Sequence, residues 1–412
     1  MVATGSADGT IGQPVQQREG WMMSRRMVVK AIGGGVLVVA ALGAGGVAIR
    51  AGQQGVFSTG EGPAYGAWQV WDGGAGDVPP MAMVRAAILA ANGHNIQPWR
   101  FTVSDDHIVL EVDSARTTGA LDPLLRERDI SIGAATENLV LAAAAHGFAA
   151  TATVTVVDGA PRIDVALAEG GSAPSRFDAV PHRPTDRAAF DTSRPVTQAS
   201  LDALAALNED ADVRMIWLSD ANAMAAFSDL TIAATKAIIA DSEQSEDSFA
   251  WWRGDGPTID AHKDGITIDT SGIPAWKRAA AKILPGQSRS AFDAAWLDST
   301  RNTHLSTAAA FGIVMARDLA SIPQRVAVGR LYQRMHLAAV EGGMAMQPLN
   351  QVVERRDREE QAGFAPTIGD RLAALTGDTQ WQAMMPFRIG YPTGVVLPSP
   401  RRPAEDVVRV DA

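Results

Sequence analysis

The chain has 412 residues, of which 46% are hydrophobic and 20% charged, a composition that predicts a sizeable core in one large domain or two smaller ones. The net charge of −10 argues against a nucleic-acid partner, because phosphate backbones are bound by concentrated lysine and arginine. The sequence contains no cysteine, which excludes a cysteine nucleophile, thiolate metal sites, iron–sulfur clusters and disulfides.

The first sixty residues have the order of a secretory leader. Arg25 and Arg26 stand directly before an apolar stretch of 19 residues, 31–49, which contains six glycines. This order resembles a twin-arginine signal, which exports proteins already folded, so that a cytosolic cofactor is loaded first. A membrane anchor stays open, since 19 residues of helix reach across a bilayer core, and cleavage of the leader is not decided. Residues 53–66 then read as a linker rich in glycine and serine.

Helix and strand patterns alternate over residues 81–169. Asn92-Gly93 ends the first helix, and Asp158-Gly159 between the last two strands predicts a β-hairpin. The loop 170–175 is a candidate boundary. The predicted elements are helices over 81–91 and 131–146 and strands over 99–103, 107–112, 151–156 and 163–167.

The second part of the chain is richer in helix patterns. The predicted elements are a helix after Ser200, a strand over 213–218, and helices over 221–240, 290–297 and 325–341. Residues 241–272 are polar and turn-rich and contain Trp251 and Trp252. Such segments are usually lids, binding loops or disordered. The proline- and arginine-rich tail from Ser399 is expected to wrap the surface.

One pattern occurs twice. Gly133-x3-Glu137-x3-Leu141-Ala142-Ala143-x3-Gly147 recurs as Gly329-x3-Gln333-x3-Leu337-Ala338-Ala339-x3-Gly343, at a constant separation of 196 positions. Helices rich in alanine and leucine can match by chance. If the repeat is real, the body consists of two related modules in one chain.

The string Asn92-Gly93-His94-Asn95-Ile96-Gln97-Pro98-Trp99-Arg100-Phe101 joins a predicted helix to a predicted strand. The amides of Asn95 and Gln97 offer donors and acceptors, which suits the mixed edge of a flavin ring. A plain helix-to-strand turn has the same shape. The string Asn-x-Gln-Pro-Trp-Arg-Phe resembles the flavin-edge loop of the FMN-dependent nitroreductase family. That resemblance implies that Asn95, Gln97, Pro98 and Arg100 contact the cofactor.

A second string, Arg183-Pro184-Thr185-Asp186-Arg187, places two arginines and a hydroxyl at alternate positions. These groups can converge on a phosphate, although a solvent-exposed turn could have the same sequence pattern. The string resembles the Arg-x-Ser-x-Arg element of the nitroreductases, with threonine for serine. The resemblance implies that Arg183, Thr185 and Arg187 hold the FMN phosphate.

Two further stretches resemble this family. Residues 344–349 follow the helix that ends at Gly342-Gly343, and the resemblance implies that Met346, Gln347 and Pro348 lie beside the flavin ring. At the C-terminal end Arg401 resembles a phosphate-binding basic residue. A lysine common two positions earlier in the family is Ser399 here, which puts the phosphate contact at this end in doubt.

The matches are divided between the two parts of the chain, so neither part alone has a complete site. This division resembles the Acg-type branch, in which two nitroreductase-like halves are fused in one chain. The resemblance implies an α+β, three-layer αβα nitroreductase-like fold that forms a pseudo-dimer. The expected organisation is an export signal and linker over 1–60, a first half over 61–178, and a second half over 179–412 with a lid over 241–272.

The resemblance implies one FMN and flavin-mediated transfer of hydride or electrons to nitro, quinone or similar acceptors from a small-molecule donor. Hydride passes directly to and from flavin, so no protein acid or base is expected to be catalytic. Two alternatives stay open: a non-catalytic protein that sequesters FMN under a closed lid, and an exported domain that has lost its flavin. His94 is open between a place near the flavin and a loop hydrogen bond.

No metal site is expected, because the seven histidines show no ligand spacing. The expected partners are the electron donor and acceptor and, during export, the twin-arginine translocase. Contact with a membrane is expected only through the N-terminal segment, and the mature protein is expected to be periplasmic or otherwise extracytoplasmic. Fusion of two halves predicts a monomer, with a further dimer open.

Overall fold

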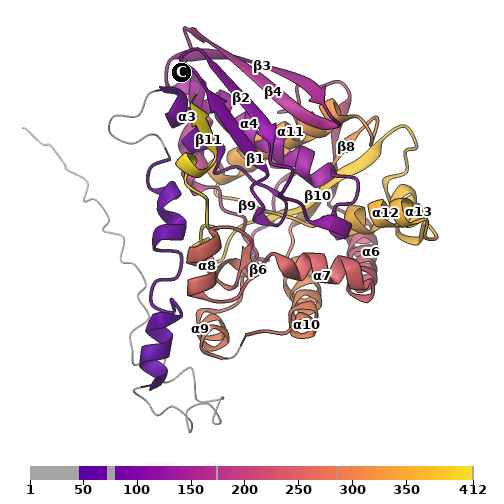
Figure 1. The fold of residues 1–412 in the computed structure, drawn as a ribbon. Helices are drawn as coiled ribbons and strands as arrows, with labels where there is room; N and C mark the ends of the chain where they lie inside the picture. The colour runs from indigo at the N-terminus through magenta and orange to yellow at the C-terminus, as the bar shows by residue number, and fades with distance from the viewer. Residues whose placement is uncertain (1–45, 72–78, 173–174, 285, 411–412) are drawn as a thin grey trace, which may run out of the picture.

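Two sheets and two long central helices form the body (Figure 1). The computed structural model describes residues 46–71, 79–172, 175–284 and 286–410, so most of the predicted export signal lies outside the described residues. Helix α4 (Arg126–Ala145) packs on the first sheet and α11 (Ile322–Glu341) on the second, and the two helices pack on each other. The chain therefore has the α+β fold that the sequence predicts.

The first sheet has the strand order β11-β1-β2-β4-β3. Its strands are β1 (Trp99–Val103), β2 (His107–Val112), β3 (Phe148–Val157), β4 (Ala160–Glu169) and β11 (Val408–Val410). The predicted hairpin is confirmed, with Asp158 and Gly159 at φ 50° and 72°, the left-handed pair that a tight hairpin turn requires. The expectation for the C-terminal tail was wrong: β11 pairs in parallel with β1, and Arg401 is buried.

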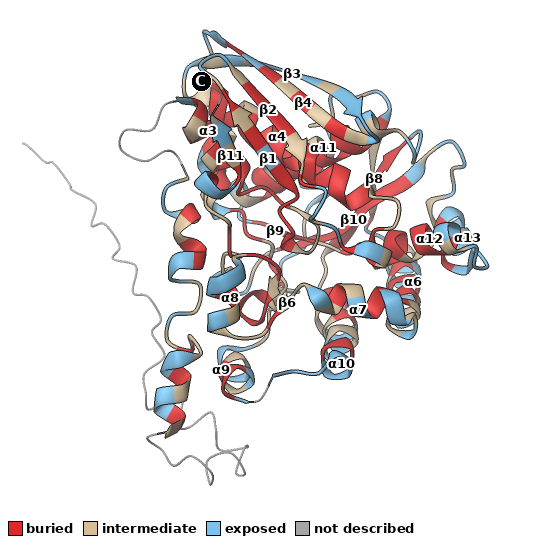
Figure 2. Ribbon diagram, in the orientation of Figure 1, coloured by how far each residue is buried: buried red, intermediate tan, exposed pale blue. Residues whose placement is uncertain are grey.

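The second sheet has the strand order β5-β8-β10-β9 and is antiparallel throughout. Its strands are β5 (Val213–Leu218), β8 (Ala310–Ala316), β9 (Ala345–Pro348) and β10 (Gln382–Gly390). Strand β8 is buried along its whole length and β10 along nearly all of it (Figure 2). The stretch after α11, expected to be a loop, is strand β9, because it pairs with β10.

The two sheets have the same connectivity. The order β1-β2-α4-β3-β4 along the chain corresponds to β5-β8-α11-β9-β10, and the strand orders β1-β2-β4-β3 and β5-β8-β10-β9 match. Two segments lengthen the second set. Residues 219–309 separate β5 from β8, and α12 (Gln351–Ala362) and α13 (Thr367–Thr376) separate β9 from β10. We call residues 219–309 the helical insertion.

Helices α4 and α11 contact each other through equivalent residues. A Cβ on Gly133 would lie 2.0 Å from the carbonyl oxygen of Val326, and a Cβ on Gly329 would lie 2.0 Å from that of Ile130. Gly133 and Gly329 differ by 196 positions, and so do Ile130 and Val326. The contact is therefore the same when the two helices are exchanged, and only glycine permits so close an approach of two backbones.

The helical insertion forms regular elements rather than the irregular lid expected over 241–272. In Figure 1, α7 to α10 gather at one end of the molecule, below the sheets. The elements are α6 (Ala221–Ala240), α7 (Ser242–Ala250), β6 (Trp252–Arg253), α8 (Gly256–His262), β7 (Ile266–Thr267), η6 (Ile268–Thr270), α9 (Ala275–Ile283), α10 (Arg289–Ser299) and η7 (Thr300–Leu305). Among the described helices, α6 alone is long and apolar enough to cross a membrane, and it packs here on α12 and α13.

Residues 46–71, which we call the N-terminal segment, bind the insertion rather than acting as the free linker that the sequence predicts. The segment begins in a helical turn, and Val47, Ala51 and Val56 are buried against α9. Arg50 Nε donates to the carbonyl of Ile283 at 2.6 Å. The remaining helical elements are η2 (Pro63–Trp68), α3 (Pro79–Ala87), η3 (Gly93–Asn95), η4 (Gly119–Leu121), η5 (Ser175–His182), α5 (Gln198–Ala205) and η8 (Ala404–Asp406).

Candidate functional site

A pocket lies where α4 and α11 meet the helical insertion. Its cavity volume is about 250 Å³. Residues 91–94, the start of α4, Tyr332 of α11, the end of β9 and the insertion all contribute to its wall. Pockets of several hundred Å³ lined by apolar and aromatic groups with a few polar ones are typical of cofactor sites.

The loop after α3 reaches the pocket with its first residues. Asn92, Gly93 and His94 line it. The backbone is left-handed at His94, Asn95 and Gln97, with φ of 47°, 55° and 52°. Such a succession is uncommon for residues other than glycine and needs support from its surroundings. Asn92 supplies part of that support, since its Oδ1 accepts a hydrogen bond from the Gln97 amide at 2.9 Å.

The two amides that were expected to bind the flavin edge point elsewhere. Gln97 is fully buried, its Nε2 donates to the carbonyl of Lys263 at 2.8 Å, and its Oε1 accepts from the Arg402 amide at 2.8 Å. Asn95 Nδ2 donates to the carbonyls of Gly265 and Pro400. Neither residue lines the pocket. Both side chains instead hold the loop against the insertion and against residues 399–410, which we call the C-terminal arm.

Two further expectations for this loop are corrected. Arg100 lies on β1 with its side chain 52% exposed and paired with Asp113 at 2.9 Å. It cannot reach the pocket, because alternate side chains of a strand point to opposite faces of the sheet and Arg100 points outward. Pro98 is buried outside the pocket wall. Its role is to start β1.

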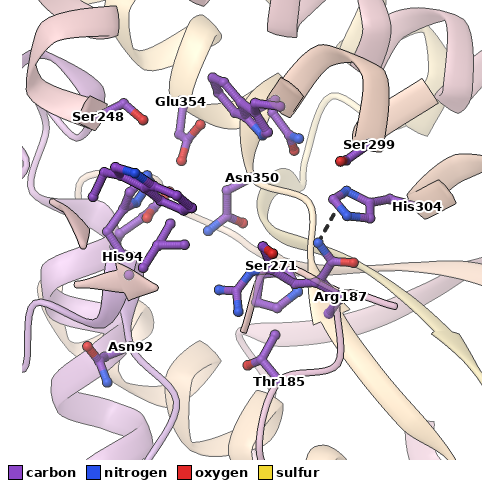
Figure 3. Close-up of a pocket in the computed structure, with 18 of the residues that line it drawn as sticks. Asn92, His94, Thr185, Arg187, Ser248, Ser271, Ser299, His304, Asn350 and Glu354 are labelled. Carbon is purple, nitrogen blue, oxygen red and sulfur yellow. Dashed lines mark hydrogen bonds between the residues drawn. The ribbon is translucent and has the colours of Figure 1, made fainter. Parts of the chain in front are cut away.

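The second motif does reach the pocket. Thr185 and Arg187 line it, and Figure 3 places both at its lower edge. Arg183 lies behind them, fully buried, where its Nη2 donates to the carbonyl of Leu89 at 2.8 Å and its Nη1 lies 3.2 Å from His336 Nδ1. The chain segments of the two motifs are thus brought together, because Leu89 directly precedes the first loop.

Arg401 joins these arginines from the C-terminal arm. Its guanidinium donates to Asn95 Oδ1 and to the carbonyl of Ala90. Burial, and after it the charges of Arg183 and Arg187, lower the pKa of Arg401 well below its usual range. Burial also lowers the pKa of Arg183 and of Arg187 to about 10. Three cations therefore lie close together with little water around them.

These three arginines lack carboxylate partners. In the part of the chain that the structure describes, each of their hydrogen bonds goes to a neutral acceptor. The Nε atoms of Arg183 and Arg401 are buried without any hydrogen-bond partner. The nearest acidic group is Asp186, which acts on Arg187. Uncompensated buried cations are unstable unless an anion binds, so this end of the pocket is suited to a phosphate.

The end of β9 forms another wall of the pocket. Gln347 and Pro348 line the pocket, whereas Met346 is fully buried and points into the core of the second sheet. Gln347 is held by Arg388, whose Nε donates to its Oε1 at 2.6 Å. His304 Nε2 and the Tyr332 hydroxyl are buried without hydrogen-bond partners, and both residues line the pocket. Their orphaned polar atoms indicate that a ligand completes this surface.

The helical insertion covers the pocket with aromatic side chains. Trp252, Phe292 and Trp296 line it, and the rings of Trp252 and Phe292 are 5.2 Å apart. Trp251 points away, because its Nε1 donates to the carbonyl of Thr117 and the guanidinium of Arg116 lies over its ring. Of the two predicted lid tryptophans, only Trp252 therefore faces the pocket.

The polar groups in the wall that sequence reasoning missed include Glu127, Asn350 and Glu354. Figure 3 shows Glu354 and Asn350 pointing into the pocket. Burial, together with the charges of Asp122 and Asp357 and against that of Arg126, raises the pKa of Glu127 to about 7. Glu127 and Glu354 are too far apart in the sequence for spacing to reveal them. The strongly polar stretch 351–362 was the one available signal, since such a helix needs charged partners if it is buried.

Comparison with solved structures finds FMN-dependent nitroreductases among the most similar chains. The FMN- and NADPH-dependent nitroreductase NfnB from Sphigopyxis sp. strain HMH is 17% identical, with 58% of this chain and 100% of that chain covered and a TM-score of 0.38. NfnB from Mycobacterium smegmatis, in complex with NADPH, is 15% identical over 57% and 96%, with a TM-score of 0.35. A nitroreductase with bound FMN from Bacteroides fragilis NCTC 9343 is 12% identical over 54% and 90%, with a TM-score of 0.31.

No protein-family model matches the chain, and no curated protein matches it significantly. The solved structures are similar at values too low to transfer any residue's role.

Proposed function

We propose that the chain is an FMN-binding oxidoreductase of the nitroreductase type, which transfers hydride or electrons through one bound flavin. The observation that carries this proposal is the cluster of Arg183, Arg187 and Arg401, of which Arg187 lines the pocket and the other two lie behind it. Two of these arginines come from a motif that resembles the phosphate element of the nitroreductases, and the third from the C-terminal position with the same resemblance. Among the described residues none of their hydrogen bonds reaches a carboxylate, so their donors stay available for a phosphate.

The residues present suit the charge of FMN. Thr185 and Arg187 would bind the phosphate directly, while Arg183 and Arg401 would add positive potential from behind. Gln347, Pro348 and Asn350 would lie along the ring. When bound, FMN supplies the hydride-transfer chemistry. The chain's own contribution is then to bind and orient the cofactor, and to exclude water with Trp252, Phe292 and Trp296.

We also propose that the body consists of two nitroreductase-like halves in one chain, as in the Acg-type branch. The matching connectivity of the two sheets and the exchangeable contact between Gly133 and Gly329 support this. The hydrogen-bonded pairs Glu137–Arg334 and Asn138–Gln333 are related in the same way. A chain that contains both halves needs no second copy to complete the pocket, so we expect a monomer.

The acceptors would be nitro compounds, quinones or similar flat molecules, because the wall beside the proposed ring site is apolar and aromatic. A second candidate function is sequestration of FMN. The observation in its favour is the attachment of the insertion, which is held over the pocket by the N-terminal segment. Lys282 of α9 donates to the carbonyl of Gly55 at 3.0 Å and pairs with Asp269 at 2.7 Å, so opening the cover requires breaking buried polar contacts.

Export by the twin-arginine route remains part of the proposal. Its support is the sequence around Arg25 and Arg26, which lies outside the described residues. A cofactor loaded in the cytosol fits a route that carries folded proteins. The donor outside the cytosol would then be a reductant other than NAD(P)H, which is scarce there.

The test starts with the visible spectrum of the purified protein, with and without added FMN. A colourless protein that does not bind added FMN would overturn the proposal. Arg187→Ala should weaken FMN binding on the order of 10- to 100-fold, since a charge-assisted bond of about 1.5–3 kcal/mol is lost. Arg194→Ala is the matched control, because Arg194 lies outside the pocket, against the ring of Tyr391. Anaerobic reduction with NAD(P)H and, in parallel, with a small reductant such as dithionite then separates the two functions. Bleaching by either donor with turnover of a quinone indicates an enzyme, and a yellow protein that does not pass electrons to a quinone with either donor indicates sequestration.

A further inference from the structure

Three side chains in the pocket wall carry ligand atoms that metals bind. His94 comes from the loop after α3, Glu127 from the first turn of α4 and Glu354 from the first half of α12. One ligand atom of each lies within 4.8 Å of the other two. Two ligands of one transition-metal ion, each at 2.0–2.2 Å, are at most about 4.4 Å apart. The three atoms therefore lie at nearly the spacing that one shared ion would impose.

The carboxyls of Glu127 and Glu354 lie within hydrogen-bonding reach of each other, so the two carboxylate ligands already face one another across the proposed site. Among the described residues, no hydrogen bond reaches the imidazole of His94. Glu354 is 3% exposed, and its Oε2 is buried with no hydrogen-bond donor. Figure 3 shows this carboxylate pointing into the pocket. A buried carboxylate oxygen without a donor is costly, so its orientation indicates a missing positive partner.

The surrounding charges leave the two glutamates without sufficient compensation. Arg126 lies 3.4 Å from Glu127, but its shorter bond, 2.7 Å, goes to Asp357. Arg356 also pairs with Asp357. The buried carboxylate of Asp122 accepts from the Glu127 amide at 3.0 Å and adds another negative charge nearby. A divalent cation between Glu127 and Glu354 would supply the charge that the arginines do not.

The backbone is shaped to bring the loop onto α4. A Cβ on Gly93 would lie 2.8 Å from Glu127 Oε2, so glycine alone leaves room for that carboxylate. The amide of Gly93 donates to Ser131 Oγ at 3.1 Å, one turn further along α4. His94 follows in a left-handed conformation, and strain of this kind is typical of functional sites.

We propose that His94, Glu127 and Glu354 bind one divalent first-row transition-metal ion in the wall of the pocket. One imidazole and two carboxylates, without a thiolate, suit Mn²⁺, Fe²⁺, Co²⁺ or Zn²⁺. Three protein ligands leave at least one coordination position open toward the pocket, for water or an oxygen of a bound molecule. The site replaces the sequence-based expectation of no metal, and it does not depend on FMN.

The experiment uses the full chain after treatment with a chelator. Zn²⁺ binding is measured by isothermal titration calorimetry, and Co²⁺ binding by the visible bands of the ion. We expect one ion per chain. Glu354→Gln and His94→Ala should each weaken binding on the order of 100-fold or more, because loss even of an outer partner costs 10- to 100-fold. Glu360→Gln on the exposed side of α12 is the matched control and should bind as the parent does.

Absence of saturable one-to-one binding in the parent, or unchanged binding in both variants, would overturn the metal site. If Glu354→Gln does not fold, as judged by circular dichroism, His94→Ala decides alone. FMN content is recorded separately from the visible spectrum. A protein that binds FMN but no metal refutes this inference and leaves the proposed function intact. A protein that binds the metal but no FMN refutes the proposed function and leaves the metal site intact.

Discussion

The contact between α4 and α11 makes a sharp prediction for Gly329→Ala. The added methyl group would lie 2.0 Å from the carbonyl oxygen of Ile130, well inside van der Waals contact. That oxygen belongs to the backbone of another helix and cannot swing aside, so the two helices must separate. Overpacking typically costs 1–3 kcal/mol and occasionally more. Because the clashing atom belongs to a backbone, the upper end of this range, about 3 kcal/mol, applies. Alanine recovers about 1 kcal/mol of helix propensity, so we expect a net loss of about 2 kcal/mol.

Urea denaturation followed by circular dichroism measures this loss. Gly133→Ala should give a similar value, because its Cβ would meet Val326 at the same 2.0 Å. Gly52→Ala is the control: it lies in a helical turn with no atom within 4 Å of the added Cβ, so it should be neutral or stabilising. Gly329→Ala within about 0.5 kcal/mol of the parent would refute the close contact, since that range is normal for surface changes.

Three further variants test other parts of the structure. Arg126→Ala leaves the fully buried Asp357 with Arg356 as its one arginine partner and should lower the free energy of unfolding by about 3–5 kcal/mol. The arginine partners of Asp357 hold its pKa below its usual range. The stabilisation that this carboxylate provides is therefore present above about pH 4 and is lost as the pH falls through its pKa in the folded protein. Acid denaturation of the parent should be steeper than that of Arg126→Ala. Arg100→Ala should leave the FMN content unchanged and should change the free energy of unfolding by no more than about 0.5 kcal/mol. Loss of flavin from this variant would indicate that Arg100 contacts the cofactor, as the sequence suggested. Lys282→Met should raise hydrogen exchange in the N-terminal segment, and protection equal to the parent would show that the Lys282 contacts do not hold that segment.

Local sequence patterns predicted the strands and helices that have one apolar, buried face and one polar face. The strands β1 and β2 begin and end as the alternation of apolar and polar residues predicts, and so does α6. Strand β8 has no such alternation because both of its faces are buried, and its apolar run Ala310–Ala316 carries no periodicity. Strand β11 has only three residues, and its pairing with β1 depends on a contact between distant parts of the chain.

For the candidate site, the sequence predicted the chain segments but not the directions of the side chains. The sequence identified the segments that form the pocket, because unusual strings of amides and arginines mark them. It did not predict where the side chains point. The backbone is left-handed at Asn95 and Gln97, and both side chains point away from the pocket. Nor could it join Glu127 to Glu354, because only the packing of α4 near α12 brings these carboxylates together.

The pairing of β11 with β1 has a consequence for synthesis of the protein. During translation, β1 leaves the ribosome early, and its outer edge stays unpaired until the last residues of the chain appear. At 5–20 residues per second this interval lasts roughly 15–60 seconds, and an open strand edge can aggregate during it. Arg401 is also made long after β1. The nascent chain would therefore gain from a chaperone that shields that edge, and cofactor insertion would follow synthesis of the segment that carries Arg401.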